Sequence, residues 1–74
     1  MPKLPVISGK ELVRVLEKLG FTPVRQSGSH VLIEHEDGRI TTVAVHGKKE
    51  IPVGTLRAIL RDIDITPDQL RDVL

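Results

Sequence analysis

The chain has 74 residues, no cysteine, and a formal net charge of +1 from 11 basic and 10 acidic side chains. This length predicts one domain, residues 1–74, and the missing cysteine excludes disulfides and thiolate metal sites. No apolar run approaches the roughly 20 residues of a membrane span, and the first residues do not resemble a secretory signal, so we expect a cytoplasmic protein without a membrane contact.

A helix is expected over residues 9–19. Ser8 and Glu11 have the S-x-x-E spacing of a capping box, which satisfies two backbone N–H groups at a helix start. The apolar stripe of this helix, at helical spacing, consists of Leu12, Leu16 and Leu19. Gly20 follows at the position where a left-handed residue ends a helix.

Three strands are expected next. The segment 21–27, "FTPVRQS", contains a proline that cannot donate to a strand ladder, so it suits the edge of a sheet. The segments 29–35 and 39–46 are apolar and rich in β-branched residues, and they flank Asp37-Gly38, a hairpin signal.

The register of this hairpin decides which side chains face each other. A two-residue turn of Asp37 and Gly38 breaks up the apolar face, whereas a three-residue loop over 37–39 keeps it continuous. Burial of one face fixes register more strongly than turn chemistry, so we expect the longer loop. The expected pairs are Val31 with Val45, Ile33 with Val43, and His30 with His46. The two histidines could then share base and acid roles, the alternative being that His46 merely ends a strand.

The C-terminal third is expected to be helical. Pro52 suits a first helical turn, and apolar residues recur with helical period as far as Ile63. Thr66-Pro67-Asp68-Gln69 is a second cap signature, which predicts a short last helix. The order is therefore α-β-β-β-α with a short extra C-terminal helix, an α+β fold with a three-stranded antiparallel sheet packed on one face by helices. The double-stranded-RNA-binding fold has the same order, although fold alone does not give function.

Basic residues form two groups. Lys10, Arg14 and Lys18 repeat every four residues opposite the leucine stripe, and Lys48-Lys49 stand in a polar loop. They could bind RNA phosphates, or they could simply form a solvated surface. The near balance of charge means that RNA binding would need them on one face, and the single aromatic residue of the chain leaves no platform for stacking bases.

His30 is the candidate for catalysis. Histidine titrates near pH ~6.5 and so exchanges protons at neutral pH. A base of this kind could activate the 2′-hydroxyl of RNA against the adjacent phosphorus without a metal or a cofactor. Gly28 before it indicates a bend or bulge, or a place where a phosphate approaches the backbone. A structural role for a histidine at a strand edge is the alternative, and the spacing of the histidines does not indicate a metal site.

Three stretches, "ISGKELVRVLEKLGF", "RQSGSH" and "HGKKEIPVGTLRAILRDIDIT", resemble the HicA toxins, also called the YcfA-like family. The resemblance implies a double-stranded-RNA-binding-like fold, endoribonuclease activity on mRNA (an mRNA interferase), and a HicB-type antitoxin partner in a toxin–antitoxin pair. The family's catalytic histidine corresponds to His30, in Gly28-Ser29-His30, and we expect Gly28 and Ser29 to contact RNA beside it. One departure is Asp64, where the family commonly has glycine at the end of the second long helix. Aspartate tolerates the left-handed conformation better than most residues, so a slightly different cap is expected there.

Two rival functions stay open. One is a non-catalytic double-stranded-RNA-binding module, for which the basic residues would matter and His30 would not. The other is a protein-interaction domain that pairs through its sheet and shows no salt-dependent RNA binding. The sequence also leaves open a homodimer or a toxin–antitoxin hetero-oligomer.

Overall fold

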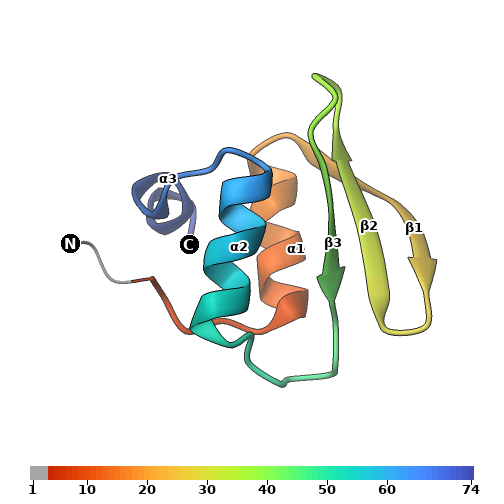
Figure 1. The fold of residues 1–74 in the computed structure, drawn as a ribbon, viewed down its shortest axis with the longest axis horizontal. Helices are drawn as coiled ribbons and strands as arrows, with labels where there is room; N and C mark the ends of the chain where they lie inside the picture. Colours follow the sequence, from red (N-terminus) through yellow and green to blue (C-terminus); the bar gives the residue numbers. More distant parts are fainter. Residues whose placement is uncertain (1–3) are drawn as a thin grey trace.

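The computed structural model of the protein describes residues 4–74, which fold in the expected order of helices and strands (Figure 1). The elements are α1 (Gly9–Lys18), β1 (Phe21–Ser27), β2 (His30–His35), β3 (Ile40–Ala44), α2 (Val53–Asp62) and α3 (Pro67–Asp72). The predicted α+β class is therefore confirmed. None of the helices in residues 4–74 has the length and apolar character needed to cross a bilayer.

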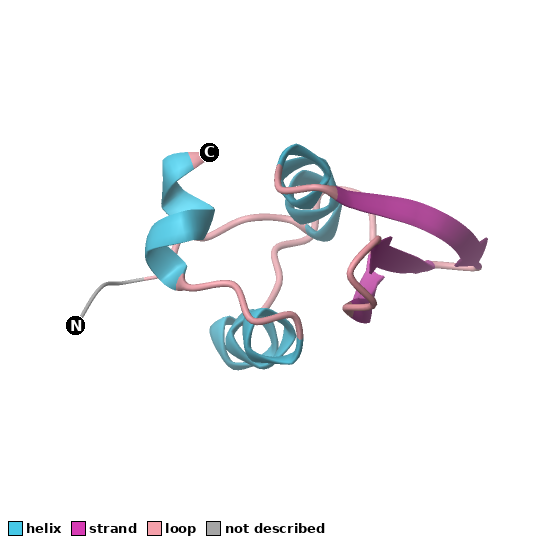
Figure 2. Ribbon diagram, turned by 90° about the horizontal axis from the view of Figure 1, so that it is seen from above, coloured by secondary structure: helices cyan, strands magenta, loops and turns pink. Residues whose placement is uncertain are grey.

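The molecule has three layers (Figure 2). The antiparallel sheet has the order β1-β2-β3, and α1 and α2 pack on one of its faces, with α3 on the far side of these two helices. Side chains from both helices and the sheet are fully buried between the layers, among them Leu12, Leu16, Ile33, Val43 and Leu56. The other face of the sheet is open, so alternate residues of β2 point to solvent.

Both predicted capping boxes are present. The backbone N–H of Glu11 donates to the Ser8 hydroxyl (3.2 Å), and that of Gln69 donates to the Thr66 hydroxyl (3.1 Å). The first helix ends at Lys18, one residue before the predicted end, which is within the ordinary uncertainty of helix boundaries.

Asp64 ends the second long helix in the left-handed conformation that the sequence predicted, with φ +55°. The N–H of Ile65 donates to the carbonyl of Leu60 (2.9 Å), and the N–H of Asp64 donates to that of Arg61 (3.2 Å). This is the bond pattern of a Schellman motif, and it satisfies carbonyls that the helix end would otherwise leave unpaired. The chain reverses here without a glycine.

The edge position of β1 is also confirmed. Its proline, Pro23, lies beside an irregularity in the pairing with β2, because the register shifts between Pro23 and Arg25. A bulge and a proline both reduce the tendency of a free strand edge to pair with another chain.

The predicted register of the β2–β3 hairpin is wrong by two residues. The loop is residues 36–38, since the N–H of His35 donates to the carbonyl of Arg39 (2.8 Å) and the N–H of Gly38 donates to that of His35 (2.9 Å). The last residue of a three-residue hairpin loop is left-handed, and Gly38 has φ +100°. The observed loop puts glycine at this position, whereas the predicted loop, residues 37–39, puts Arg39 there. The observed pairs are Val31 with Val43, Ile33 with Thr41, and His30 with Ala44.

A shift of two residues keeps every side chain on its face, so the continuous apolar face that motivated the prediction is present. Val31, Ile33 and Val43 are all buried on it. The cross-strand pair of His30 and His46 is not formed, because β3 ends at Ala44.

The tip of this hairpin is fixed to the end of α2. Arg39 binds both carboxylate oxygens of Asp37 (2.9 and 3.1 Å from Nε) and donates from Nη1 to the carbonyl of Ile63 (2.7 Å). Its guanidinium also lies 5.1 Å from the centre of the Phe21 ring. The guanidinium beside Asp37 lowers the pKa of that carboxyl below its usual 3.8.

Candidate functional site

His30 begins β2 and stands on the open face of the sheet. Its side chain is exposed, and its neighbours across the ladder are Ser27 on β1 and Ala44 on β3. Both neighbours are small, so a large substrate can approach the imidazole from the solvent side. The described structure therefore leaves the imidazole of His30 open to solvent.

Gly28 and Ser29 form the two-residue turn that joins β1 to β2. Gly28 has φ +58°, the sign that a type II′ hairpin requires at its first central residue, so the predicted bend is confirmed. A Cβ there would meet no atom within 4 Å, which means that the backbone conformation, and not crowding, calls for glycine. The carbonyl of Ser29 accepts a bond from the N–H of Val45 (2.6 Å), which fixes the turn against the chain leaving β3.

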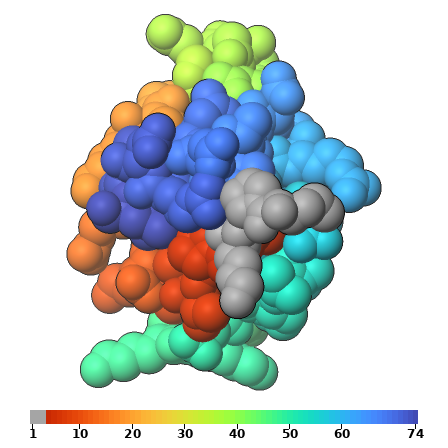
Figure 3. Space-filling model, turned by 90° about the vertical axis from the view of Figure 1, so that its left-hand side faces the viewer, coloured from red at the N-terminus to blue at the C-terminus, as the bar shows by residue number. Residues whose placement is uncertain are grey.

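The turn, the start of α1, the end of β3 and the loop that follows it meet at one end of the molecule (Figure 1). In Figure 3 that loop and the β2–β3 hairpin project from opposite ends. Backbone pairing joins the loop to the segment before α1, since the N–H of Ile51 donates to the carbonyl of Ile7 (2.8 Å) and Ser8 forms a bridge with Glu50. Most of the predicted site residues lie at this end.

The predicted basic residues lie in three places, two of which are at the opposite ends of α1. Lys10, Arg14 and Lys48 border one hollow at the start of α1. Lys18 lies at the other end of the helix, where its amine is 3.5 Å from the carbonyl of Val73. The structure thus brings Lys48 close to Lys10 and Arg14, and it separates Lys18 from these three residues.

One acidic residue, Glu11, also borders this hollow. Glu11 accepts a bond from the backbone N–H of Ser8 (3.1 Å), and this bond is the largest cause that lowers the pKa of its carboxyl. The ionised carboxylate adds negative charge beside Lys10, Arg14 and Lys48, and Arg14 is among the causes that lower its pKa. Neither lysine forms a salt bridge within residues 4–74.

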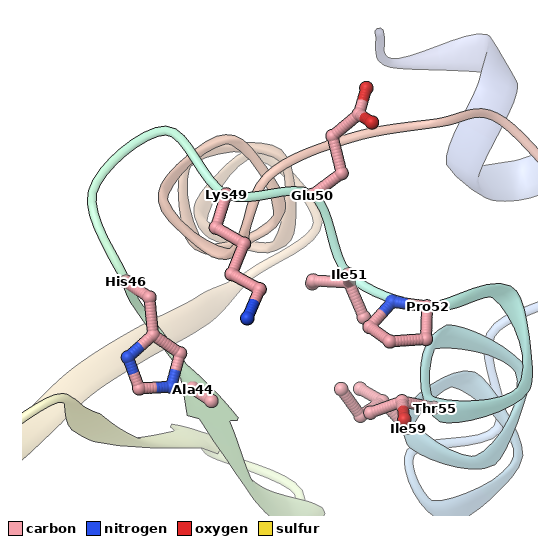
Figure 4. Close-up of a pocket in the computed structure, with 8 residues that line it drawn as sticks. All are labelled: Ala44, His46, Lys49, Glu50, Ile51, Pro52, Thr55 and Ile59. Atoms are coloured by element: carbon pink, nitrogen blue, oxygen red, sulfur yellow. The ribbon is translucent and has the colours of Figure 1, made fainter.

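Lys49 and His46 line a different cavity, of about 230 Å³, between the end of β3 and the start of α2 (Figure 4). Its remaining walls are mostly apolar and come from Ala44, Glu50, Ile51, Pro52, Thr55 and Ile59. None of these was a predicted site residue. The strand and the helix are joined by an irregular loop, and no spacing along the sequence indicates that they enclose a cavity.

His35 has a structural role, unlike the two exposed histidines. Its ring packs edge-on against Phe21, with centroids 5.0 Å apart, and its Nδ1 lies 3.1 Å from both the backbone nitrogen and a carboxylate oxygen of Asp37. Across residues 4–74, no three histidine or carboxylate side chains come together as a set that could hold a metal ion.

The chain matches a known protein-family model. The family model described as the HicA toxin of bacterial toxin–antitoxin systems matches residues 9–65, from the first residue of α1 to the residue after the left-handed Asp64. No curated protein matches the chain.

Proposed function

Because this chain belongs to the HicA toxin family, we propose that it exerts its toxicity by cutting messenger RNA with His30. Its role as a toxin and the existence of a cognate antitoxin follow from the family, as the resemblance of the sequence predicted. The cutting of RNA, the use of His30 and a HicB-type antitoxin are our proposal. The observation that carries it is the exposed histidine on the open sheet face, directly after a Gly-Ser turn.

The proposed reaction is an internal transfer within the RNA. The imidazole of His30 accepts the proton of a 2′-hydroxyl, the 2′-oxygen bonds to the adjacent phosphorus, and the bond from phosphorus to the 5′-oxygen breaks. The leaving 5′-oxygen takes up a proton, for which we propose His46. The products are a 2′,3′-cyclic phosphate and a 5′-hydroxyl, and the step uses no metal or cofactor.

Positive charge at the same end of the molecule as the turn before His30 would support this reaction in two ways. Lys10, Arg14 and Lys48 would hold phosphates of the strand, since such contacts supply most of the affinity for a nucleic acid. Cationic groups also stabilise the charge that develops on the phosphorus oxygens in the transition state. The proposed place of action is the cytoplasm, where the messenger is found.

The antitoxin would inhibit the toxin by occupying the place of the RNA. A HicB-type partner that covers Lys10, Lys48 and His30 is expected to be acidic there, because complementary charge speeds association and selects the partner. We expect the complex to be weakened by salt.

The test compares His30→Ala with His46→Ala, two substitutions of exposed histidines. We expect His30→Ala to keep its circular dichroism spectrum, to lose growth inhibition, and to cut RNA about 10²–10⁴ times more slowly. The wild-type products should carry 2′,3′-cyclic phosphate ends. A folded His30→Ala protein that cuts at the wild-type rate would refute the proposal. RNA binding without any cutting by the wild type would favour the non-catalytic module instead, and a full rate for His46→Ala would remove His46 as the acid.

A further inference from the structure

We propose that the cavity between the end of β3 and the start of α2 holds one base of the RNA strand and so selects the nucleotide beside the cut. This inference rests on the proposed RNA cleavage by His30. It assigns a specificity role to residues of the cavity, above all Thr55.

The position of the cavity relates it to His30. Ala44 is one of its wall residues and is also the cross-strand partner of His30. Residues directly opposite each other in an antiparallel pair have Cβ atoms about 4.5–5.5 Å apart. An RNA chain with one ribose at His30 therefore needs to pass only the edge of β3 to place a neighbouring base in the cavity.

The walls suit a base that cannot stack on an aromatic ring. Phe21 is the only aromatic residue in the sequence and is 2% exposed, so the usual stacking platform of single-strand binders is absent from this surface. Ile51, Pro52 and Ile59 instead supply aliphatic walls. At about 230 Å³ the cavity is smaller than the roughly 300–1,000 Å³ of sites for drug-sized ligands, which favours a single planar ring system.

The polar groups at the opening suit a nucleotide rather than an apolar peptide side chain. Figure 4 shows the Lys49 amine directed into the opening, with the His46 ring at its rim, while the Glu50 carboxylate points away. A phosphate attached to the bound base would meet Lys49. Thr55 offers a hydroxyl, which can both donate to and accept from the edge of a base.

The binding test uses Thr55→Phe, which fills the cavity, and Ala58→Phe as its matched control. Both residues are exposed on α2, and Ala58 lines none of the hollows described above. The probes are the four nucleoside 3′-monophosphates, with ribose 5-phosphate as the base-free control, added to isotope-labelled His30→Ala protein. We expect changes in the amide chemical shifts of Ile51, Thr55 and Ile59 with at least one nucleotide and none with ribose 5-phosphate. These changes should disappear in the protein that carries Thr55→Phe as a second substitution. They should remain in the protein that carries Ala58→Phe instead.

The cleavage test uses the same two substitutions in the active protein and an RNA of random sequence. Thr55→Phe should lower kcat/KM by about tenfold or more and change the nucleotide frequencies beside the cut, and Ala58→Phe should do neither. Shifts that are the same with ribose 5-phosphate, or an unchanged cutting pattern in Thr55→Phe, would overturn the base site. If the wild type cuts no RNA while the nucleotide shifts still disappear in Thr55→Phe, the proposed function fails and the cavity stands as a nucleotide site.

Discussion

Gly9 lies directly against the backbone of Ala44, so that a Cβ on Gly9 would stand 2.0 Å from the Ala44 carbonyl oxygen. The first residue of α1 thus touches the strand residue that faces His30. No left-handed conformation is involved, and glycine is required at this position by space alone. The contact fixes the start of α1, with Lys10, relative to the proposed site.

The first prediction compares two glycine-to-alanine substitutions. Gly9→Ala forces backbone apart and should lower the free energy of unfolding by about 1–3 kcal/mol or more. Gly54→Ala lies in α2, where a Cβ meets nothing within 4 Å, and should raise it by about 0.4–1 kcal/mol. Urea denaturation of both variants measures the difference. Equal effects of the two substitutions would contradict the close packing of α1 on β3.

The second prediction concerns the salt dependence of RNA binding. Lys10→Gln with Lys48→Gln should weaken binding and flatten the plot of log affinity against log salt by about 0.7–1 per lost phosphate contact. Lys18→Gln is the control, because Lys18 lies at the opposite end of α1. Binding to the His30→Ala protein at several salt concentrations gives the slopes. If the slope changes equally in the double variant and in Lys18→Gln, Lys10 and Lys48 are part of an ordinary solvated surface and do not form a specific phosphate site.

The third prediction uses the left-handed residue after α2. Asp64→Gly removes the cost of φ +55° for a residue with a Cβ and should raise the free energy of unfolding by up to about 1 kcal/mol. Asp62→Gly makes the same chemical change at the last residue of α2, where the backbone is helical, and should lower it by up to about 0.5–1 kcal/mol. Opposite signs in thermal denaturation would verify the cap, whereas a loss of stability in Asp64→Gly would count against it.

The fourth prediction concerns stability in acid. The pKa of Asp37 is lower in the folded protein than its usual 3.8, chiefly because Arg39 binds the ionised form. The resulting stabilisation is complete above the unfolded pKa and is lost as the pH falls below about 4 through the folded pKa. Asp37→Asn should therefore be less stable than the wild type at neutral pH, and the difference should shrink in acid.

Glu11 must be controlled in that experiment, because its pKa is also lowered, mainly by the bond from the Ser8 backbone. The comparison is between Asp37→Asn and Glu11→Gln, each measured by urea unfolding over a pH series. A difference between the wild type and Asp37→Asn that stays constant down to about pH 2 would show that Arg39 does not favour the ionised carboxylate.

Local signals in the sequence were sufficient for most of the fold. Ser8 with Glu11 and Thr66 with Gln69 specify their helix starts through neighbouring atoms, so the structure reproduces them. The hairpin register was different, because burial of one face cannot distinguish two registers that differ by two residues. The left-handed requirement at Gly38 decides between them, and the prediction gave that signal too little weight.

The local geometry of the candidate site was predictable where the signal lies within a few residues, and not where several elements meet. His30 stands out by its Gly-Ser turn, and the turn is formed as expected. The spacing that placed Lys18 with Lys10 follows one helix face, but eight residues at 1.5 Å rise separate them by about 12 Å along the axis. Ala44 and Thr55 meet only through the packing of β3 and α2, which no spacing reveals.

The strand order β1-β2-β3 has a consequence for the rate at which the protein folds. Each strand pairs with its neighbour in sequence through a short connection, so the sheet forms with little loss of loop entropy. We expect the chain to fold on the order of milliseconds, as mixed domains with local pairing do. Synthesis of a protein is far slower than this, so the toxin becomes competent almost as soon as the ribosome releases it. Protection of the cell then depends on antitoxin that is already present when the toxin is made.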